Sequence, residues 1–110
     1  MVIVYSAMEN KNMKTVINSV RSIIEEINTY IGGRYSSYYV GITDDPERRL
    51  FVEHNVPQNG DWVYKQSDSD ESARAVENHF LDLGCQGGPR GGSDDSTYVY
   101  AYKITADTVQ

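Results

Sequence analysis

Four side chains between positions 39 and 77 are of types that suit chemistry on a phosphate ester: Tyr39, Arg49, His54 and Glu77. A guanidinium presents planar, paired donors to phosphate oxygens. A single carboxylate can hold a Mg²⁺ ion that keeps most of its water ligands. A tyrosine hydroxyl can orient an attacking water, and a histidine one helical turn beyond the arginine can carry a proton. One hypothesis for these residues is therefore phosphodiester hydrolysis.

Each of these side chains also has a purely structural alternative. Arg49 lies four residues before Glu53, a spacing at which an exposed ion pair contributes about 0.2–0.5 kcal/mol to a helix. Glu77 lies at the border of an apolar helical stripe, where it could be solvated or pair with Arg74. The tyrosine could be a packed strand aromatic, and the histidine a structural or exposed residue. The residue types alone leave both interpretations open.

The hydrophobic pattern predicts the elements that must position these residues. β-Branched and aromatic runs predict strands over 2–6, 36–43, 61–67 and 97–104. Steps of three and four residues predict helices over 12–31, from 44 or 45 to about 54, and up to 83. The predicted helix caps are Asn12 for the first helix and Asp44 or Asp45, followed by Pro46, for the second. The first helix is expected to stop at Gly32.

Strands and helices alternate along the chain, but these strands alternate in polarity rather than being continuously apolar. Strands buried on both faces of a parallel sheet are usually apolar throughout. We therefore predict an α+β fold with a mixed or mostly antiparallel sheet of three to four strands flanked by helices. The length of 110 residues predicts a single domain over 1–110.

The net charge of −6 disfavours generic binding to a phosphate backbone, although a local basic site remains compatible with it. One cysteine, Cys85, cannot form an intramolecular disulfide, and no signal peptide or membrane span is apparent. We therefore expect a cytoplasmic protein with no membrane partner. The glycine-rich stretch 84–96, including the 84–92 loop, lacks a phosphate-loop motif, so it either connects two elements or closes over a substrate or partner.

The stretch "YYVGITDDPERRL" resembles the second half of the signature of GIY-YIG endonucleases. Tyr39, Val40 and Gly41 match the Tyr-Ile-Gly tripeptide, and Arg49 follows ten residues after Tyr39. The later stretch "WVYKQSDSDESARAVENHF" resembles the family's third strand and glutamate helix, and places Glu77 at the metal position. The resemblance covers 38–83. It implies a Mg²⁺- or Mn²⁺-dependent nuclease acting on DNA, of a kind that suits a phage or mobile element.

The resemblance assigns roles to these side chains, but the family's first Gly-Ile-Tyr strand has no clear counterpart. Arg49 would clamp phosphate, Glu77 would bind the metal and Tyr39 would position water or phosphate. The tyrosine of the first strand would be the general base, and Tyr5 in 3–5 is the candidate, with the 12–31 helix inserted after it. The first alternative is a catalytically degenerate domain that binds nucleic acid or protein. The second is an unrelated α+β protein whose tyrosine face packs in a homo-oligomer or against a partner.

Overall fold

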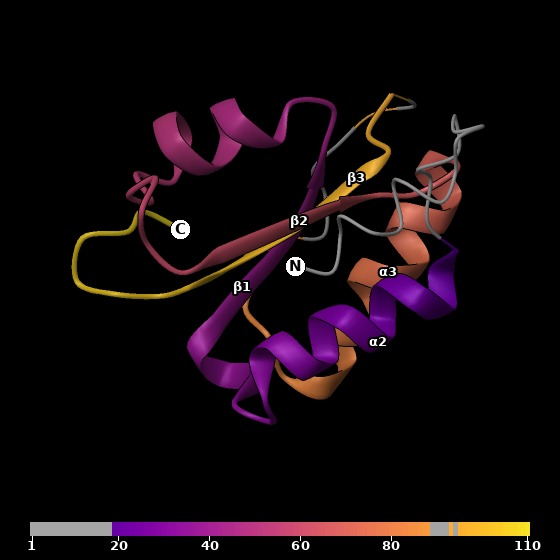
Figure 1. Cartoon of the computed structure of the whole chain (residues 1–110), viewed down its shortest axis with the longest axis horizontal. Coiled ribbons are helices and arrows are strands. Elements are labelled where there is room, and N and C mark those ends of the chain that lie inside the picture. Colours follow the sequence, from indigo (N-terminus) through magenta and orange to yellow (C-terminus); the bar gives the residue numbers. More distant parts are fainter. Residues whose placement is uncertain (1–18, 89–92, 94) are drawn as a thin grey trace.

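The computed structural model describes residues 19–88, 93 and 95–110, and in this part the chain forms a three-stranded antiparallel sheet with helices on both faces. Two α-helices cover one face, and a short helical segment after the first described strand covers the other (Figure 1). The predicted α+β class is therefore confirmed. No helix of the described ranges has the length and hydropathy that a membrane span requires.

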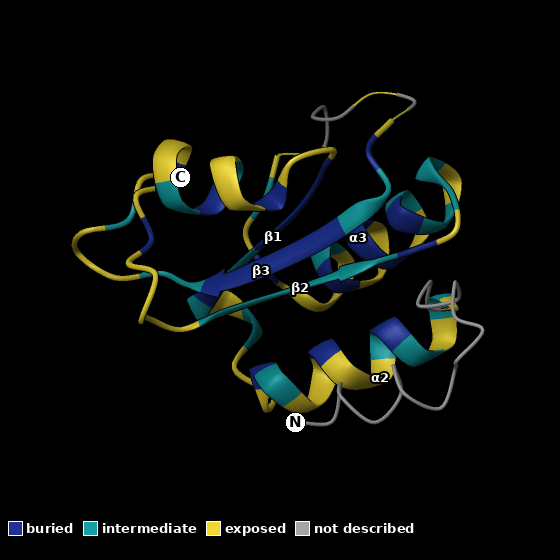
Figure 2. Cartoon of the chain, turned by 45° about the horizontal axis from the view of Figure 1, so that its top comes forward, coloured by how far each residue is buried: buried dark blue, intermediate teal, exposed yellow. Residues whose placement is uncertain are grey.

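The sheet places its last strand in the centre. The strands are β1 (Tyr38–Thr43), β2 (Trp62–Gln66) and β3 (Tyr98–Lys103), in the order β1-β3-β2. Gly41 of β1 and Tyr64 of β2 lie opposite Tyr100 of β3 on either side. Figure 2 shows β3 buried along most of its length and β2 at intermediate burial. Each predicted strand in the described part is present, shortened by one or two residues at its ends.

The first described helix, α2 (Val20–Ile31), is shorter than the 12–31 helix that the periodicity predicts. Ser19 has an extended backbone and its side chain accepts a hydrogen bond from the Ser22 amide, so Ser19 is the N-cap. The predicted cap Asn12 lies outside the described residues, as do the 2–6 strand and Tyr5. The predicted stop is confirmed, because Gly32 adopts the left-handed conformation with φ of 64°.

The helix α3 (Asp70–Leu83) carries the candidate metal ligand. Ser69 caps its N-terminus by accepting a hydrogen bond from the Ser72 amide, and Gly84 terminates it with φ of 115°. One face of α3 is buried and consists of Ala73, Val76, Glu77 and Phe80. The sequence predicts one apolar stripe of Ala73, Val76, Phe80 and Leu83, and this prediction was wrong at Leu83, which is 43% exposed.

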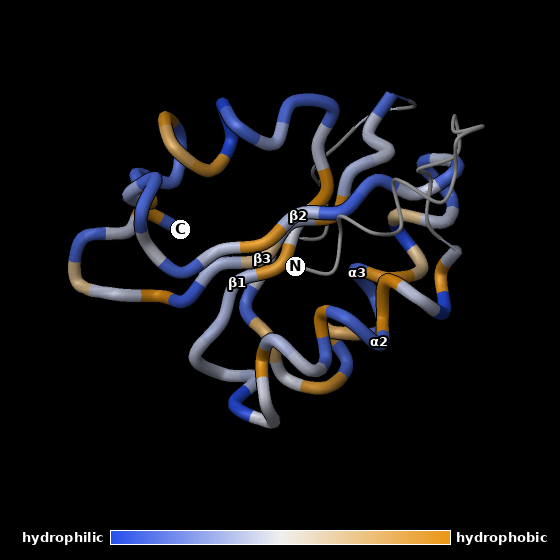
Figure 3. Tube along the Cα trace, viewed as in Figure 1, coloured by the Kyte–Doolittle hydropathy of each residue, from blue (hydrophilic) through white to orange (hydrophobic). Residues whose placement is uncertain are grey.

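Each face of the sheet has its own hydrophobic core, and Figure 3 shows the apolar residues that contribute along the strands and on both α-helices. The larger core lies between the sheet and the two α-helices, and includes Ile23, Ile27, Val40, Ile42, Val76, Phe80 and Val99. The smaller core, on the opposite face, consists of Leu50, Val56, Tyr100 and Tyr102, with partly buried aromatic residues around it. Tyr100 and Tyr102 of β3 therefore pack inward, under the helical segment.

That helical segment, η3 (Arg48–Glu53), is a π-helix rather than the α-helix predicted to about 54. Asp45, the second of the two predicted caps, accepts a hydrogen bond from the Arg48 amide at 3.1 Å. The His54 amide donates to the Arg49 carbonyl at 2.9 Å, five residues back. In an α-helix, side chains five apart point about 140° away from each other. The wider turn of the π-helix brings the side chains of Arg49 and His54 closer to the same side of the helical segment. Such turns occur frequently at functional sites.

Candidate functional site

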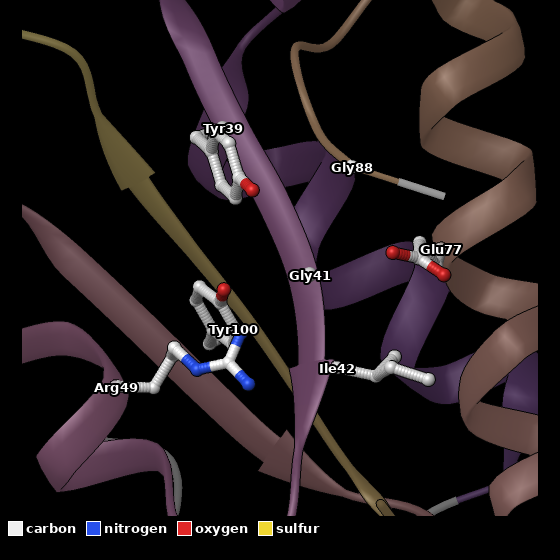
Figure 4. A pocket seen from close by; sticks show the side chains of 7 residues that line it. All are labelled: Tyr39, Gly41, Ile42, Arg49, Glu77, Gly88 and Tyr100. Carbon is white, nitrogen blue, oxygen red and sulfur yellow. The ribbon is translucent and has the colours of Figure 1, made fainter. Parts of the chain in front are cut away.

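Three of the predicted site residues line one cavity of about 310 Å³, and a tyrosine that was not predicted completes it (Figure 4). The lining residues are Tyr39, Gly41, Ile42, Arg49, Glu77, Gly88 and Tyr100. They come from β1, η3, α3, the segment after α3, and β3. The fourth predicted residue, His54, lies behind the cavity wall, and Tyr5 lies outside the described residues.

Gly41 leaves room for the Tyr100 hydroxyl beside β1, the strand that separates the two halves of the site. In Figure 4 the β1 ribbon passes between Glu77 on one side and Arg49, with the two tyrosines, on the other. A Cβ atom at position 41 would lie 2.5 Å from the Tyr100 hydroxyl oxygen, closer than real contacts allow. The glycine that resembles the end of the family tripeptide therefore has a local steric role, because it admits the hydroxyl of Tyr100.

Arg49 both forms the ion pair with Glu53 and lines the cavity, so its structural and its functional interpretation are compatible. Its Nε atom lies 2.8 Å from Glu53 Oε1, so the predicted ion pair is confirmed, and Arg48 approaches the other oxygen of Glu53 at 3.3 Å. The buried Nε nevertheless makes no hydrogen bond to any described group, because distance alone does not align its N–H with the carboxylate. The guanidinium also lines the cavity, so it has donor capacity available there.

Glu77 is a buried carboxylate that faces the cavity. Its residue is 3% exposed, and no described group forms a hydrogen bond with it. Burial raises the pKa of Glu77 from 4.5 to about 7, and the charge of Arg74 opposes this rise. Arg74 forms an ion pair with Asp70 at 3.7 Å, whereas no such pair joins it to Glu77. A carboxylate that opens onto a cavity is a suitable ligand for a cation.

The donor set fits a hydrated magnesium ion better than a metal held entirely by protein. No group of three or more His, Cys, Asp or Glu side chains converges in the described ranges. Mg²⁺ usually keeps several waters and is bound by one or two carboxylates together with substrate phosphates. The single carboxylate of Glu77 beside an open cavity fits that pattern, whereas a zinc site would require more ligands.

Tyr39 is both a packed aromatic and a cavity residue. Its ring stacks on Tyr102 at a centroid distance of 5.2 Å and on Tyr100 at 6.3 Å. The Gly88 amide donates a hydrogen bond to its hydroxyl oxygen. Burial raises the pKa of Tyr39, although the nearby charge of Arg49 opposes the rise. The hydroxyl therefore stays protonated at neutral pH and can donate to a ligand.

His54 and Tyr100 form a hydrogen-bonded pair between the smaller core and the cavity. His54 Nε2 lies 2.8 Å from the Tyr100 hydroxyl oxygen, and the imidazole is buried. Burial lowers the pKa of His54, so the ring is neutral at neutral pH. The sequence pattern predicts a strand around Tyr100 but does not place this tyrosine in the site. The available signal was the alternation of tyrosines in 98–102, and it could be used only once the strand was known to pair with β1.

No family model matches this chain, and neither the curated proteins nor the solved structures contain a detectable relative. The chemistry of the cavity must therefore be argued from its own residues. It offers one cation for phosphate oxygens, one carboxylate for a metal ion, and two tyrosine hydroxyls. The second of these hydroxyls is hydrogen-bonded to a neutral histidine that can take up a proton.

Proposed function

We propose that this protein is a metal-dependent endonuclease of GIY-YIG type that hydrolyses phosphodiester bonds in DNA. One observation carries the proposal: side chains from β1, η3, α3 and β3 meet in a single open cavity, and they are Tyr39, Arg49, Glu77 and Tyr100. Purely structural roles for the ion pair and the stacked tyrosine do not require a buried carboxylate to lie in the same cavity. Phosphodiester hydrolysis uses all four groups.

The reaction assigns each residue a distinct task. A water oxygen forms a bond to phosphorus, and the bond between phosphorus and the sugar oxygen that leaves is broken. Arg49 would stabilise the charge that accumulates on the phosphate oxygens, because its guanidinium donates to them. Tyr39 would orient the phosphate or the water through its hydroxyl. Glu77 would hold Mg²⁺ or Mn²⁺, which when bound supplies positive charge to the phosphate and leaving oxygens.

Tyr100 would replace the tyrosine of the family's first strand. The resemblance predicts that strand before Tyr39 in the chain, and Tyr5 stays an untested candidate for its tyrosine. β3 lies antiparallel to β1 and places Tyr100 opposite Gly41, in the cavity. A strand that comes later in the chain can therefore supply the second hydroxyl.

Cleavage of supercoiled plasmid and of single-stranded DNA, with Mg²⁺ or Mn²⁺, tests this proposal. Arg49→Ala and Glu77→Gln should each lower the rate by about 100-fold or more, which is the usual loss when one preorganised electrostatic group is removed. Arg21→Ala is the matched control. Arg21 forms an exposed ion pair with Glu25 at the same four-residue spacing, but it lies in α2, away from the cavity. Cleavage that survives both site substitutions would overturn the proposal.

A binding module is the second candidate, and the ion pair of Arg49 favours it. Glu53 already neutralises the guanidinium, and Arg48 adds a second cation to the same carboxylate. A site of this kind could bind nucleic acid or protein weakly without catalysing any reaction. Saturable binding by the intact protein, with no turnover in either metal, would support this alternative.

A further inference from the structure

The segment 105–109, which follows β3, folds back towards His54. Its turn is closed by two threonines: the Thr108 hydroxyl accepts from the Thr105 amide at 3.0 Å, and the Thr105 hydroxyl accepts from the Asp107 amide at 3.2 Å. Asn55, whose φ of 57° ends the helical segment, donates its side-chain amide to the Asp107 carbonyl at 3.0 Å. The 105–109 segment is therefore fixed against the end of η3.

The Val109 backbone contacts His54 twice. Its amide donates to the His54 carbonyl at 2.8 Å, and its carbonyl oxygen lies 2.6 Å from His54 Nδ1. A carbonyl oxygen can only accept, so Nδ1 of the neutral ring must carry the proton. The Tyr102 hydroxyl, 3.0 Å from Nδ1, then donates to the same carbonyl at 3.3 Å. Nε2 consequently has a free lone pair and accepts a hydrogen bond from the Tyr100 hydroxyl.

We propose that Val109 is a positioning residue: its carbonyl fixes the Nδ1–H tautomer of His54, so that Nε2 can receive the proton of Tyr100. This inference rests on the nuclease activity proposed above. As the attacking water gives a proton to the Tyr100 hydroxyl oxygen, that hydroxyl gives its own proton to Nε2. The resulting hydroxide oxygen bonds to phosphorus, the leaving oxygen takes up a proton from solvent, and His54 later returns its proton to solvent.

The groups around His54 keep its ring neutral, so that Nε2 is free to take up a proton. The groups that face its ring are Tyr39 from β1, Tyr100 and Tyr102 from β3, and Arg49 and Glu53 from η3. Burial lowers the pKa of the imidazole, as does Arg49, whereas the Val109 carbonyl and Glu53 raise it. Burial also raises the pKa of Tyr100, which makes a lasting tyrosinate costly. Passing the proton on to a neutral histidine avoids that species.

The tautomer can be measured directly by ¹⁵N NMR of the two histidine rings, independently of any cleavage. His79, which is exposed, is assigned by loss of its signals in His79→Gln. In the intact protein near neutral pH we expect His54 to show a protonated Nδ1 and an unprotonated Nε2. Tyr100→Phe should keep this tautomer, because the Val109 carbonyl remains. A protonated Nε2 in the neutral ring of the intact protein would overturn the proposal, whether or not the protein cleaves DNA.

Shortening the chain tests whether Val109 sets the tautomer. A chain ending at Asp107 should lose the Nδ1–H preference and should lower kcat by about tenfold or more with little change in KM, because part of the general-base contribution is lost. Gln110→Ala is the matched control: it keeps the Val109 carbonyl within a peptide bond and should keep both. Retention of the tautomer in the chain ending at Asp107 would contradict the role of Val109. Absence of cleavage in the intact protein would instead contradict the proposed function and leave the tautomer result valid.

Discussion

At the scale of the residue, Glu77 combines burial with the absence of a hydrogen bond or ion pair to any described residue, and this combination is unfavourable for the fold. An ionised carboxylate in an apolar environment loses hydration that only a cation or a set of donors can replace. Raising the pKa of the carboxyl to about 7 is the consequence of this lost hydration. Groups with strongly raised pKa values that also face a cavity are candidates for functional roles. The free energy of unfolding should therefore depend on pH through the ionisation of Glu77, the proposed metal ligand.

We predict that Glu77→Gln stabilises the protein at alkaline pH and not at acidic pH. Because the folded pKa is above the ordinary value of 4.5, folding takes up a proton between pH 4.5 and about 7, and the stability of the wild type falls as pH rises through this window. Glutamine has no charge to desolvate. The variant should match the wild type near pH 4 and exceed it by up to about 3 kcal/mol at pH 8, measured by urea unfolding. A difference independent of pH would contradict this prediction.

At the scale of the element, the segment 85–88 protects the exposed edge of β1 and supplies one wall of the cavity. The Val40 amide donates to the Gln86 carbonyl at 2.9 Å, and the Gln86 amide donates to the Tyr38 carbonyl at 2.9 Å. This close approach depends on a glycine, because a Cβ atom at position 87 would lie 2.6 Å from the Val40 carbonyl oxygen. The next residue, Gly88, donates to the Tyr39 hydroxyl.

We predict that Gly87→Ala separates this segment from β1 and destabilises the fold by about 1–3 kcal/mol, as overpacking usually does. The Val40 and Gln86 amides should then exchange hydrogen faster, whereas the Ala101 amide in the centre of the sheet should follow only the global change. Gly88→Ala is the matched control, since its Cβ would meet the Tyr39 hydroxyl at an ordinary distance of 3.6 Å. If the Val40 and Gln86 amides exchange at the same rate in both variants, the close approach at position 87 does not hold the segment 85–88 against β1.

Elements fixed by residues close together in sequence could be predicted in this chain, whereas features that depend on long-range pairing could not. Periodicity and caps predict α3, the strands and the stop of α2, because these depend on residues close together in sequence. The π turn of η3 was not predicted, since its hydrogen bond from His54 to Arg49 has no distinguishing residue pattern. Placing Tyr100 in the site requires the pairing of β3 with β1, which joins residues about sixty positions apart. Local patterns carry no such information.

At the scale of the whole molecule, the net charge of −6 limits how nucleic acid can be held. Arg49 is the one basic side chain among the described residues that line the cavity. Each neutralised phosphate contributes a slope of about −0.9 to the dependence of log affinity on log salt concentration. A protein that relies on one such contact should bind DNA weakly and with little dependence on salt.

We therefore predict a slope of about −1 to −2 for binding of a fluorescent DNA duplex by the Glu77→Gln variant, which removes the proposed metal ligand. The reason is that acidic side chains elsewhere repel the backbone, so that few phosphates come within reach of a cation. Fluorescence anisotropy across a series of salt concentrations measures this slope. A slope steeper than about −4 would indicate a basic contact surface and contradict the prediction.

The central position of β3 has a consequence for the order in which the molecule is made. During synthesis, β1 and β2 emerge first, but they do not pair with each other. Neither strand can pair until β3 has been synthesised. Long-range pairing of this kind is slow, because the intervening loops must close before any contact forms. The Tyr100 hydroxyl reaches the cavity only in that final step. A nascent chain would therefore hold Arg49 and Glu77 without the completed cavity, and the proposed activity would begin only once β3 has paired.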